Sequence, residues 1–326
     1  MQYKPLGNTG ISLSTLSFGA SPLGNEFGET DAAEGLRAVH AALDLGINCF
    51  DTSPYYGRTL SEARLGEALE QAGVTTGSRR AEIVLSTKCG RYDTAGFDFS
   101  AARVKRSVDE SLARLRTGYV DLLFAHDVEF GDPRQIVEET IPALREIQRS
   151  GKARFIGISG FPLGVLKAIA ESATVDAILS YCHYNLLMDD LDTELAPFCE
   201  DEGIGLLNAS PLHMRVLSEI GPPEWHPAPA EVKAAARAVL ATCQRYGARI
   251  EDVALQFCAA YRGAATTIVG LAERAHVEAN VAALLKTADP ALLAEIAAVV
   301  APVKNRGWHT GYYAAEDGVS ETGESG

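Results

Sequence analysis

Four side chains that could move a proton stand at the ends of apolar stretches of the chain. Asp51 follows the stretch 47–50 and precedes Tyr56 by five positions, while Lys88 and His126 follow two later stretches. A phenol with a pKa of about 10 is a poor base near neutral pH unless a neighbouring positive charge stabilises the phenolate. We therefore expect Lys88 to lower the pKa of Tyr56 and make it an acid–base group.

Each of these residues also has an ordinary structural explanation. Asp51 could cap a turn, Tyr56 could pack within a loop, and His126 could be a buried structural histidine. Lys88 is harder to explain in this way, because a buried ammonium needs a charge partner, and Asp51 can be that partner. With His126 hydrogen-bonding the reacting oxygen, the four residues together indicate proton transfer coupled to hydride transfer.

The pattern of apolar stretches predicts the elements that position these residues. Short β-type stretches alternate with amphipathic stretches of helical spacing, which is typical of a parallel sheet. The predicted strands are 16–18, 47–50, 83–86, 120–124, 155–158, 177–179, 205–207 and 267–269. Eight strands with matching helices close most simply as a (β/α)8 TIM barrel, although the count alone also allows an open doubly wound sheet. In a barrel the four residues would meet at one mouth.

A single barrel domain accounts for residues 1–310. Residues 3–13 predict a short β-hairpin around an Asn/Gly turn that could close the bottom of the barrel. Near the other end of the chain, we expect a C-terminal loop with Trp308 to fold over the barrel mouth. The acidic, Gly/Ser-rich residues 311–326 are expected to form a flexible tail.

Composition limits the partners. The formal net charge of −14 argues against binding to a nucleic-acid backbone or to an anionic membrane surface, and favours a small substrate. No apolar run approaches the roughly 18 residues needed to span a bilayer. Six cysteines without a CxxC pair are typical of reduced thiols in the cytoplasm and do not predict a metal site. The sequence does not specify the oligomeric state.

The four residues resemble the catalytic tetrad of the aldo-keto reductase superfamily in order, spacing and strand placement. The segments 6–10 and 50–57 are also similar to that family, and the resemblance covers about residues 3–305. It implies that Tyr56 is the general acid/base and that an extended nicotinamide dinucleotide lies across the barrel mouth. The family binds this cofactor without a GxGxxG motif, and no such motif occurs here.

The same resemblance implies the cofactor-binding positions. Ser159 would bind the nicotinamide carboxamide, Ser210 and Leu212 would line the pyrophosphate loop, and Gly270 with Asn280 would flank the adenosine. The chain departs from the common pattern where Tyr181 replaces a glutamine and where Ala209 replaces the aromatic residue that often stacks on the nicotinamide. We therefore expect Tyr181 to bind the cofactor by stacking there instead.

The residues expected near the adenosine of the cofactor predict a preference for NAD over NADP. Gly270 and His276 stand where NADP-preferring relatives often have Lys and Arg, so a 2′-phosphate would lack its usual partners. Arg274 is the residue that could overturn this expectation.

Loop segments resemble those of family members that oxidise a sugar at its anomeric carbon. They are 19–24, 88–92, 96–100, 180–184 and 221–227. The resemblance implies oxidation of an aldose at C1 with NAD, with L-galactose converted to its lactone, as in plant-type ascorbate biosynthesis, as the expected reaction. L-Fucose or another D-threo-aldose is the alternative substrate. The side chains expected to contact the sugar are Asp127, His183, Asn185 and Trp308.

Two other functions fit parts of the pattern. Lys88 could form a Schiff base, as in some barrel aldolases, but the accompanying tetrad argues against it. The chain could also be a cofactor-binding regulatory subunit, since some aldo-keto reductase relatives attach to ion channels. That function predicts tight cofactor binding with negligible turnover.

Overall fold

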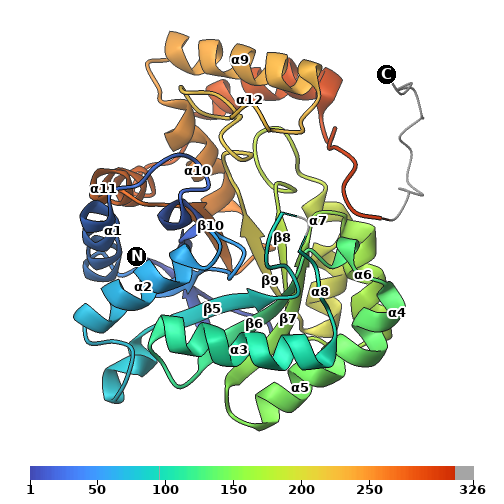
Figure 1. Cartoon of the computed structure of the whole chain (residues 1–326). Helices are drawn as coiled ribbons and strands as arrows, with labels where there is room; N and C mark the ends of the chain where they lie inside the picture. The colour runs from blue at the N-terminus through green and yellow to red at the C-terminus, as the bar shows by residue number, and fades with distance from the viewer. Residues whose placement is uncertain (95, 313–326) are drawn as a thin grey trace.

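The computed structural model describes residues 1–94 and 96–312. Within these ranges, eight parallel strands close into a barrel in the order β10-β3-β4-β5-β6-β7-β8-β9, with helices around it (Figure 1). The barrel strands are β3 (Leu16–Gly19), β4 (Cys49–Asp51), β5 (Val84–Cys89), β6 (Val120–His126), β7 (Ala153–Gly160), β8 (Ala177–Tyr181), β9 (Gly205–Ala209) and β10 (Thr266–Gly270). This confirms the predicted TIM barrel. Lys88 and His126 lie within the last residues of their strands rather than after them.

The helices form a ring and a second group outside it. The ring and its neighbours comprise α1 (Ala32–Asp44), α2 (Leu60–Gln71), α3 (Ala101–Leu115), α4 (Pro133–Gln135), α5 (Ile141–Arg149), α6 (Leu163–Ser172), α7 (Leu191–Glu194), α8 (Ala196–Glu202), α10 (Ile250–Ala260) and α11 (Arg274–Ala283). The outer pair, α9 (Ala230–Arg245) and α12 (Pro290–Val300), lies together at the top of Figure 1. No helix in the described ranges is long and apolar enough to cross a membrane.

The outer pair builds a second hydrophobic cluster. Apolar side chains of α9, α10 and α12 pack there with residues from two loops, 186–188 and 216–217. Trp308 packs against the same cluster. The cluster therefore anchors both the long segment between β9 and α9 and the C-terminal segment.

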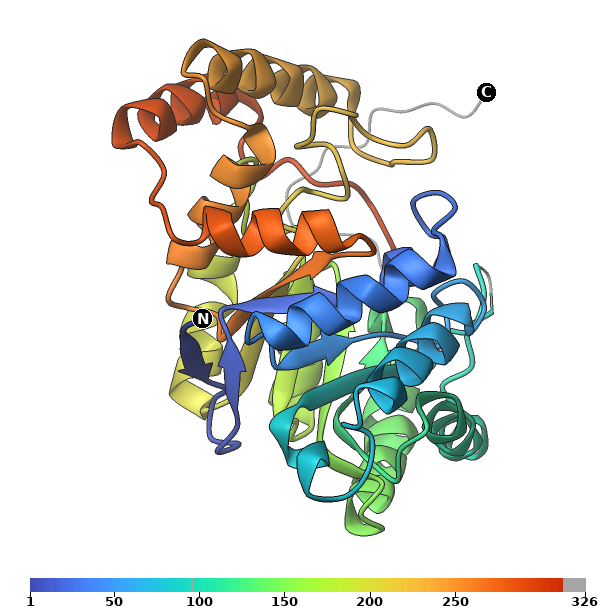
Figure 2. The same ribbon diagram turned by 90° about the vertical axis from the view of Figure 1, so that its left-hand side faces the viewer.

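The predicted hairpin is present at the start of the chain. Strands β1 (Tyr3–Pro5) and β2 (Ser12–Ser14) pair antiparallel, and Figure 2 shows them at one end of the barrel. Leu6, Ile11 and Leu13 are buried among side chains of the barrel interior. The hairpin thus closes that end.

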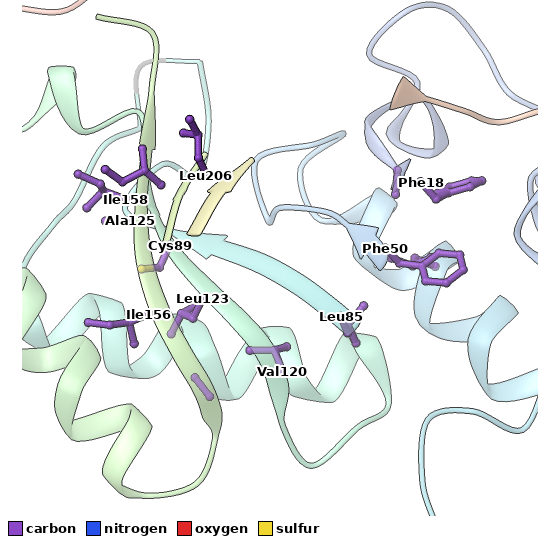
Figure 3. Close-up of a cluster of buried hydrophobic side chains, with 14 of the residues drawn as sticks. Phe18, Phe50, Leu85, Cys89, Val120, Leu123, Ala125, Ile156, Ile158 and Leu206 are labelled. Carbon is purple, nitrogen blue, oxygen red and sulfur yellow. The ribbon is translucent and has the colours of Figure 1, made fainter. Parts of the chain in front are cut away.

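The strands bury both faces, as expected for a parallel sheet covered by helices. On β6, Leu122 and Phe124 belong to the cluster inside the barrel, whereas Leu123 belongs to the cluster between strands and helices. Figure 3 shows part of the cluster between strands and helices. In it, the ring centroids of Phe18 and Phe50, which come from neighbouring strands, lie 5.7 Å apart. This alternation directs every second residue of each strand into the barrel.

Left-handed residues follow four of the strands directly. They are Gly90 (φ +94°), Asp127 (φ +53°), Cys182 (φ +67°) and Ser210 (φ +61°). Such backbone is uncommon for residues other than glycine, although Asp adopts it more readily than most. The chain therefore turns sharply at the carboxyl ends of the strands, where the predicted active site lies. Of the predicted tail, residues 313–326 lie outside the described ranges.

Candidate active site

A cavity of about 390 Å³ opens at the carboxyl ends of the strands. Asp51, Tyr56, Lys88 and His126 all line it. They come from the end of β4, the loop after it, β5 and β6. The fold therefore brings together the four residues that the sequence suggested for proton transfer.

Asp51 and Lys88 form an ion pair in the barrel interior. Lys88 Nζ donates to Asp51 Oδ2 at 2.6 Å and to the Thr52 carbonyl oxygen at 2.8 Å, and the Lys88 side chain is only 1% exposed. The Ser86 hydroxyl, which shares the inward face of β5 with Lys88, donates to Asp51 Oδ1 at 2.7 Å. Burial alone lowers the pKa of Lys88, but Asp51 and Tyr56 outweigh it, so the net shift is upward and the ammonium stays charged.

Tyr56 lies beside this pair. Its ring centroid is 4.8 Å from Lys88 Nζ, and its backbone is held where Gly24 and Gly57 allow two loops to touch. A Cβ at Gly57 would lie 2.2 Å from the Gly24 carbonyl oxygen, so a side chain there would push the loops apart. Burial raises the pKa of Tyr56 to about 12, against the lowering effect of the Lys88 ammonium. The net shift is opposite to the expected one, because burial outweighs the charge.

His126 faces the cavity as a neutral imidazole. Burial, followed by the charges of Lys88 and Arg91, holds its pKa well below the usual value. The Ser53 hydroxyl oxygen accepts from the Tyr55 N–H at 3.1 Å and lies 3.1 Å from His126 Nδ1. The Ser53 hydroxyl can donate its proton to Nδ1, and the Asp127 carboxylate 3.7 Å from Nε2 favours the tautomer with the proton on Nε2. His126 can therefore donate a hydrogen bond to a substrate oxygen.

A second charged pair lines the wall next to His126. The Arg91 guanidinium forms an ion pair with the buried carboxylate of Asp127 and lies over the Tyr55 ring, 3.8 Å from its centroid. Behind it, Glu129 is fully buried, and its Oε1 accepts from the Phe161 N–H at 3.2 Å. Burial and the nearby Asp127 raise the pKa of Glu129 to about 8. The wall therefore offers both donors and acceptors to a polar ligand.

The candidate cofactor positions divide into two groups. Ser159, Ser210 and Gly270 line the cavity together with Tyr181. Leu212 does not line it and packs against the second hydrophobic cluster, and Asn280 lies on α11 away from it. The cavity thus brings together four of the six candidate cofactor positions.

Tyr181 and Ala209 are cross-strand neighbours on β8 and β9, and both line the cavity. Ala209 carries only a methyl group, so it adds little side-chain bulk to the cavity wall beside Tyr181. Stacking of the nicotinamide on Tyr181 stays a prediction.

The candidate sugar-contacting residues also divide. Trp308 and Asp127 line the cavity, and Trp308 stacks on Phe161 with 4.3 Å between ring centroids. The Asn185 side chain bonds the backbone of its own loop, donating to the Cys182 carbonyl and accepting from Leu187 N–H. His183 Nδ1 lies 2.9 Å from the Asp190 carboxylate. The structure therefore places His183 and Asn185 outside the cavity, in the loop that supports it.

Several residues of the site were not predicted from the sequence. Arg91 and Tyr55 line the cavity together with Phe27 and Trp225. Ser53 contacts His126 Nδ1. The rings of Phe27 and Trp225 lie 5.9 Å apart and join two loops that are distant in sequence. Arg91 stands in a segment noted for its resemblance to sugar-oxidising relatives, and this was the available signal for it.

Comparisons with known proteins identify relatives of this chain. The chain is 46% identical to L-galactose dehydrogenase of Arabidopsis thaliana, over 96% of this chain and 98% of that protein. It is 29% identical to D-threo-aldose 1-dehydrogenase of a Pseudomonas species, over 76% and 82% of the two chains. The solved structure of an aldo-keto reductase from Bacillus halodurans in its holo form superposes with a TM-score of 0.74 and 29% identity, covering 95% of this chain and 98% of that one.

Members of the aldo/keto reductase family use nicotinamide cofactors. The model of that family matches residues 15–301, which is most of the chain and contains all the barrel strands. This protein belongs to the aldo/keto reductase family.

Proposed function

We propose that this protein oxidises an aldose at C1 with NAD, and that L-galactose, converted to L-galactonolactone, is its substrate. The main observation in favour of this reaction is the buried Asp51–Lys88 ion pair beside Tyr56, all three of which line a cavity with polar walls. The choice of sugar rests on the likeness to the Arabidopsis L-galactose dehydrogenase along nearly the whole chain. The likeness to the Pseudomonas enzyme favours a D-threo-aldose or L-fucose as the second candidate.

In this reaction Tyr56 accepts the proton of the anomeric hydroxyl. His126 Nε2 donates a hydrogen bond to the same oxygen and orients it, while Lys88 stabilises the developing phenolate. NAD, when bound, accepts the hydride from C1, and C1 becomes the carbonyl carbon of the lactone. Because the pKa of Lys88 is raised, the residue remains an ammonium, which argues against a Schiff-base reaction that needs a neutral amine.

Acidic side chains support the proposed preference for NAD. Arg274 Nε donates to Glu278 Oε1 at 2.6 Å, and the Arg274 backbone N–H donates to Glu34 Oε1 at 2.9 Å. His276 lies near Glu273, with 3.8 Å between the ring nitrogen and the carboxylate. A 2′-phosphate at this end would meet three carboxylates and an arginine already paired with one of them.

The proposal is tested by following NADH absorbance with NAD and a panel of L-galactose, L-fucose, D-arabinose and D-galactose. The expected result is turnover that is fastest with L-galactose and is lost in Tyr56→Phe. Tyr119→Phe, at the opposite end of the barrel, is the matched control for the loss of a phenol hydroxyl. Tight cofactor binding without turnover of any sugar would instead support the regulatory-subunit function.

A further inference from the structure

The carboxylate of Asp127 lies close to His126 Nε2, the atom that donates a hydrogen bond to the reacting oxygen in the proposed reaction. Asp127 Oδ2 is 3.7 Å from His126 Nε2, and both residues line the cavity. Consecutive residues of a strand point to opposite faces, so a regular strand could not bring both side chains into the cavity. The left-handed backbone of Asp127, with φ of +53°, makes this possible.

Arg91 holds this carboxylate in place. The guanidinium pairs with Asp127 Oδ2 and is itself positioned over the Tyr55 ring. Among the described residues, no group donates a hydrogen bond to Asp127 Oδ1. This oxygen is not one of the fully buried atoms without a partner, so it keeps contact with the cavity. That oxygen therefore remains free to accept a hydrogen bond from a ligand in the cavity.

Sugar chemistry limits what that ligand group can be. If His126 holds the oxygen on C1, the next nearest oxygens of a pyranose are the ring oxygen and the hydroxyl on C2. A carboxylate only accepts hydrogen bonds, and a ring oxygen has no proton to give. Among these two, only the C2 hydroxyl can bond to Asp127.

We propose that Asp127, positioned by Arg91, is the specificity-determining group that binds the hydroxyl on the carbon next to the reacting one. This inference rests on the proposed oxidation of an aldose at C1 and adds the part of the sugar that this wall recognises. Arg91 is a positioning residue in this scheme. The site therefore prefers a 2-hydroxy aldose over one that lacks this hydroxyl.

The test compares kcat/KM for L-galactose with kcat/KM for 2-deoxy-L-galactose in each variant. A hydrogen bond to a charged group predicts that the wild-type protein prefers L-galactose by roughly 10- to 100-fold. Asp127→Asn and Asp127→Gly are suitable variants because both residues tolerate left-handed backbone. Asp127→Gly removes the acceptor and is expected to bring the preference to within about threefold, whereas Asp127→Asn keeps a neutral acceptor oxygen and should lower the preference less. Since both sugars are measured on the same sample, any loss of folded protein cancels in the ratio.

Arg91→Met tests the positioning role and should reduce the ratio of the two kcat/KM values toward the ratio found for Asp127→Gly. Asp93→Asn is the matched control, because Asp93 is an exposed acid near the cavity that pairs with Arg58, and it should leave the ratio unchanged. Equal losses for both sugars in the Asp127 variants would overturn the inference.

A binding measurement separates this inference from the proposed function. In a Tyr56→Phe background, quenching of tryptophan fluorescence reports sugar binding, because Trp225 and Trp308 line the cavity. L-Galactose should bind more tightly than its 2-deoxy analogue, and Asp127→Gly should remove the difference. If the wild-type protein oxidises no aldose, the proposed function fails, and equal binding of the two sugars would show separately that the inference fails.

Discussion

Lys88 Nζ lies 2.6 Å from Asp51 Oδ2, with both side chains almost fully removed from solvent. Removing water from two charges is costly, and their attraction offsets that cost only when the geometry is good and the remaining polar atoms are bonded. Ser86 and the Thr52 carbonyl complete the pair in this way. The pair keeps a positive charge beside Tyr56 inside an apolar barrel.

Asp51→Asn should therefore affect both stability and catalysis. The amide cannot neutralise the buried ammonium, so the free energy of unfolding should fall by about 3–5 kcal/mol. Because Lys88 is then no longer held as a charged neighbour of Tyr56, kcat should fall by roughly 10²- to 10³-fold. Denaturant unfolding and steady-state kinetics measure the two effects. In the double variant Asp51→Asn/Lys88→Met, destabilisation should be smaller than the sum of the single effects, and strict additivity would contradict the coupling.

The rate of sugar oxidation should rise with pH. Because burial raises the pKa of Tyr56 to about 12, only a small phenolate fraction exists at neutral pH, and this fraction grows about tenfold per pH unit below the pKa. The logarithm of kcat/KM for oxidation is expected to increase between about pH 7 and 9, whereas reduction of the lactone should not increase. A pH profile that is flat in the oxidative direction would exclude Tyr56 as the rate-determining base.

Glu129 should make the protein less stable as pH rises. Its pKa is raised from 4.5 to about 8, so the folded protein retains a proton that the unfolded chain releases. Its contribution to stability is complete below about pH 4.5, and is lost as pH rises to about 8, with a limiting slope of about 1.4 kcal/mol per pH unit.

Glu129→Gln removes this titration while preserving the shape of the side chain. The variant should therefore gain thermal stability over the wild type at pH 8.5 but not at pH 5. Glu138→Gln, at an exposed acid that pairs with Arg134, is the control and should show no such difference. A gain for Glu129→Gln that is equal at both pH values would contradict the assignment.

Releasing Arg274 should improve the use of NADP. Glu278→Gln breaks an exposed ion pair, and because such pairs contribute at most about 1 kcal/mol, the gain in kcat/KM for NADP should be at most about fivefold. The value for NAD should not change. Adding Arg274→Gln should abolish the gain, and a gain that persists in this double variant would mean that another cation binds the 2′-phosphate.

Much of the architecture could be predicted from the sequence because it depends on local patterns. The alternation of apolar stretches located each of the barrel strands, since a buried parallel strand needs a short continuous apolar run. The strand ends were less accurate: β5 and β6 continue through Lys88 and His126, because polar residues that face a barrel interior interrupt the apolar pattern without ending the strand.

The sequence predicted those site residues whose type and position at the end of a single strand, or in the loop after it, already suggest a function. Arg91 and Asp127 are 36 positions apart, and their pairing depends on the left-handed turn after β6, which has no periodic signature. Asn185 and His183 have suitable polar groups, but their own loop uses them. Which hydrogen bonds a loop side chain makes depends on backbone geometry rather than on residue type.

From the sequence alone, the eight-stranded barrel, the four residues of the tetrad and their meeting at one mouth could be stated, because strand period and residue type are properties of the chain itself. The tertiary structure decided the depth of burial, and with it the direction in which the pKa of Tyr56 moves. It also decided which distant charges face one another. The physical reason is the same in both cases: desolvation and charge pairing depend on distances between residues that are far apart in the sequence.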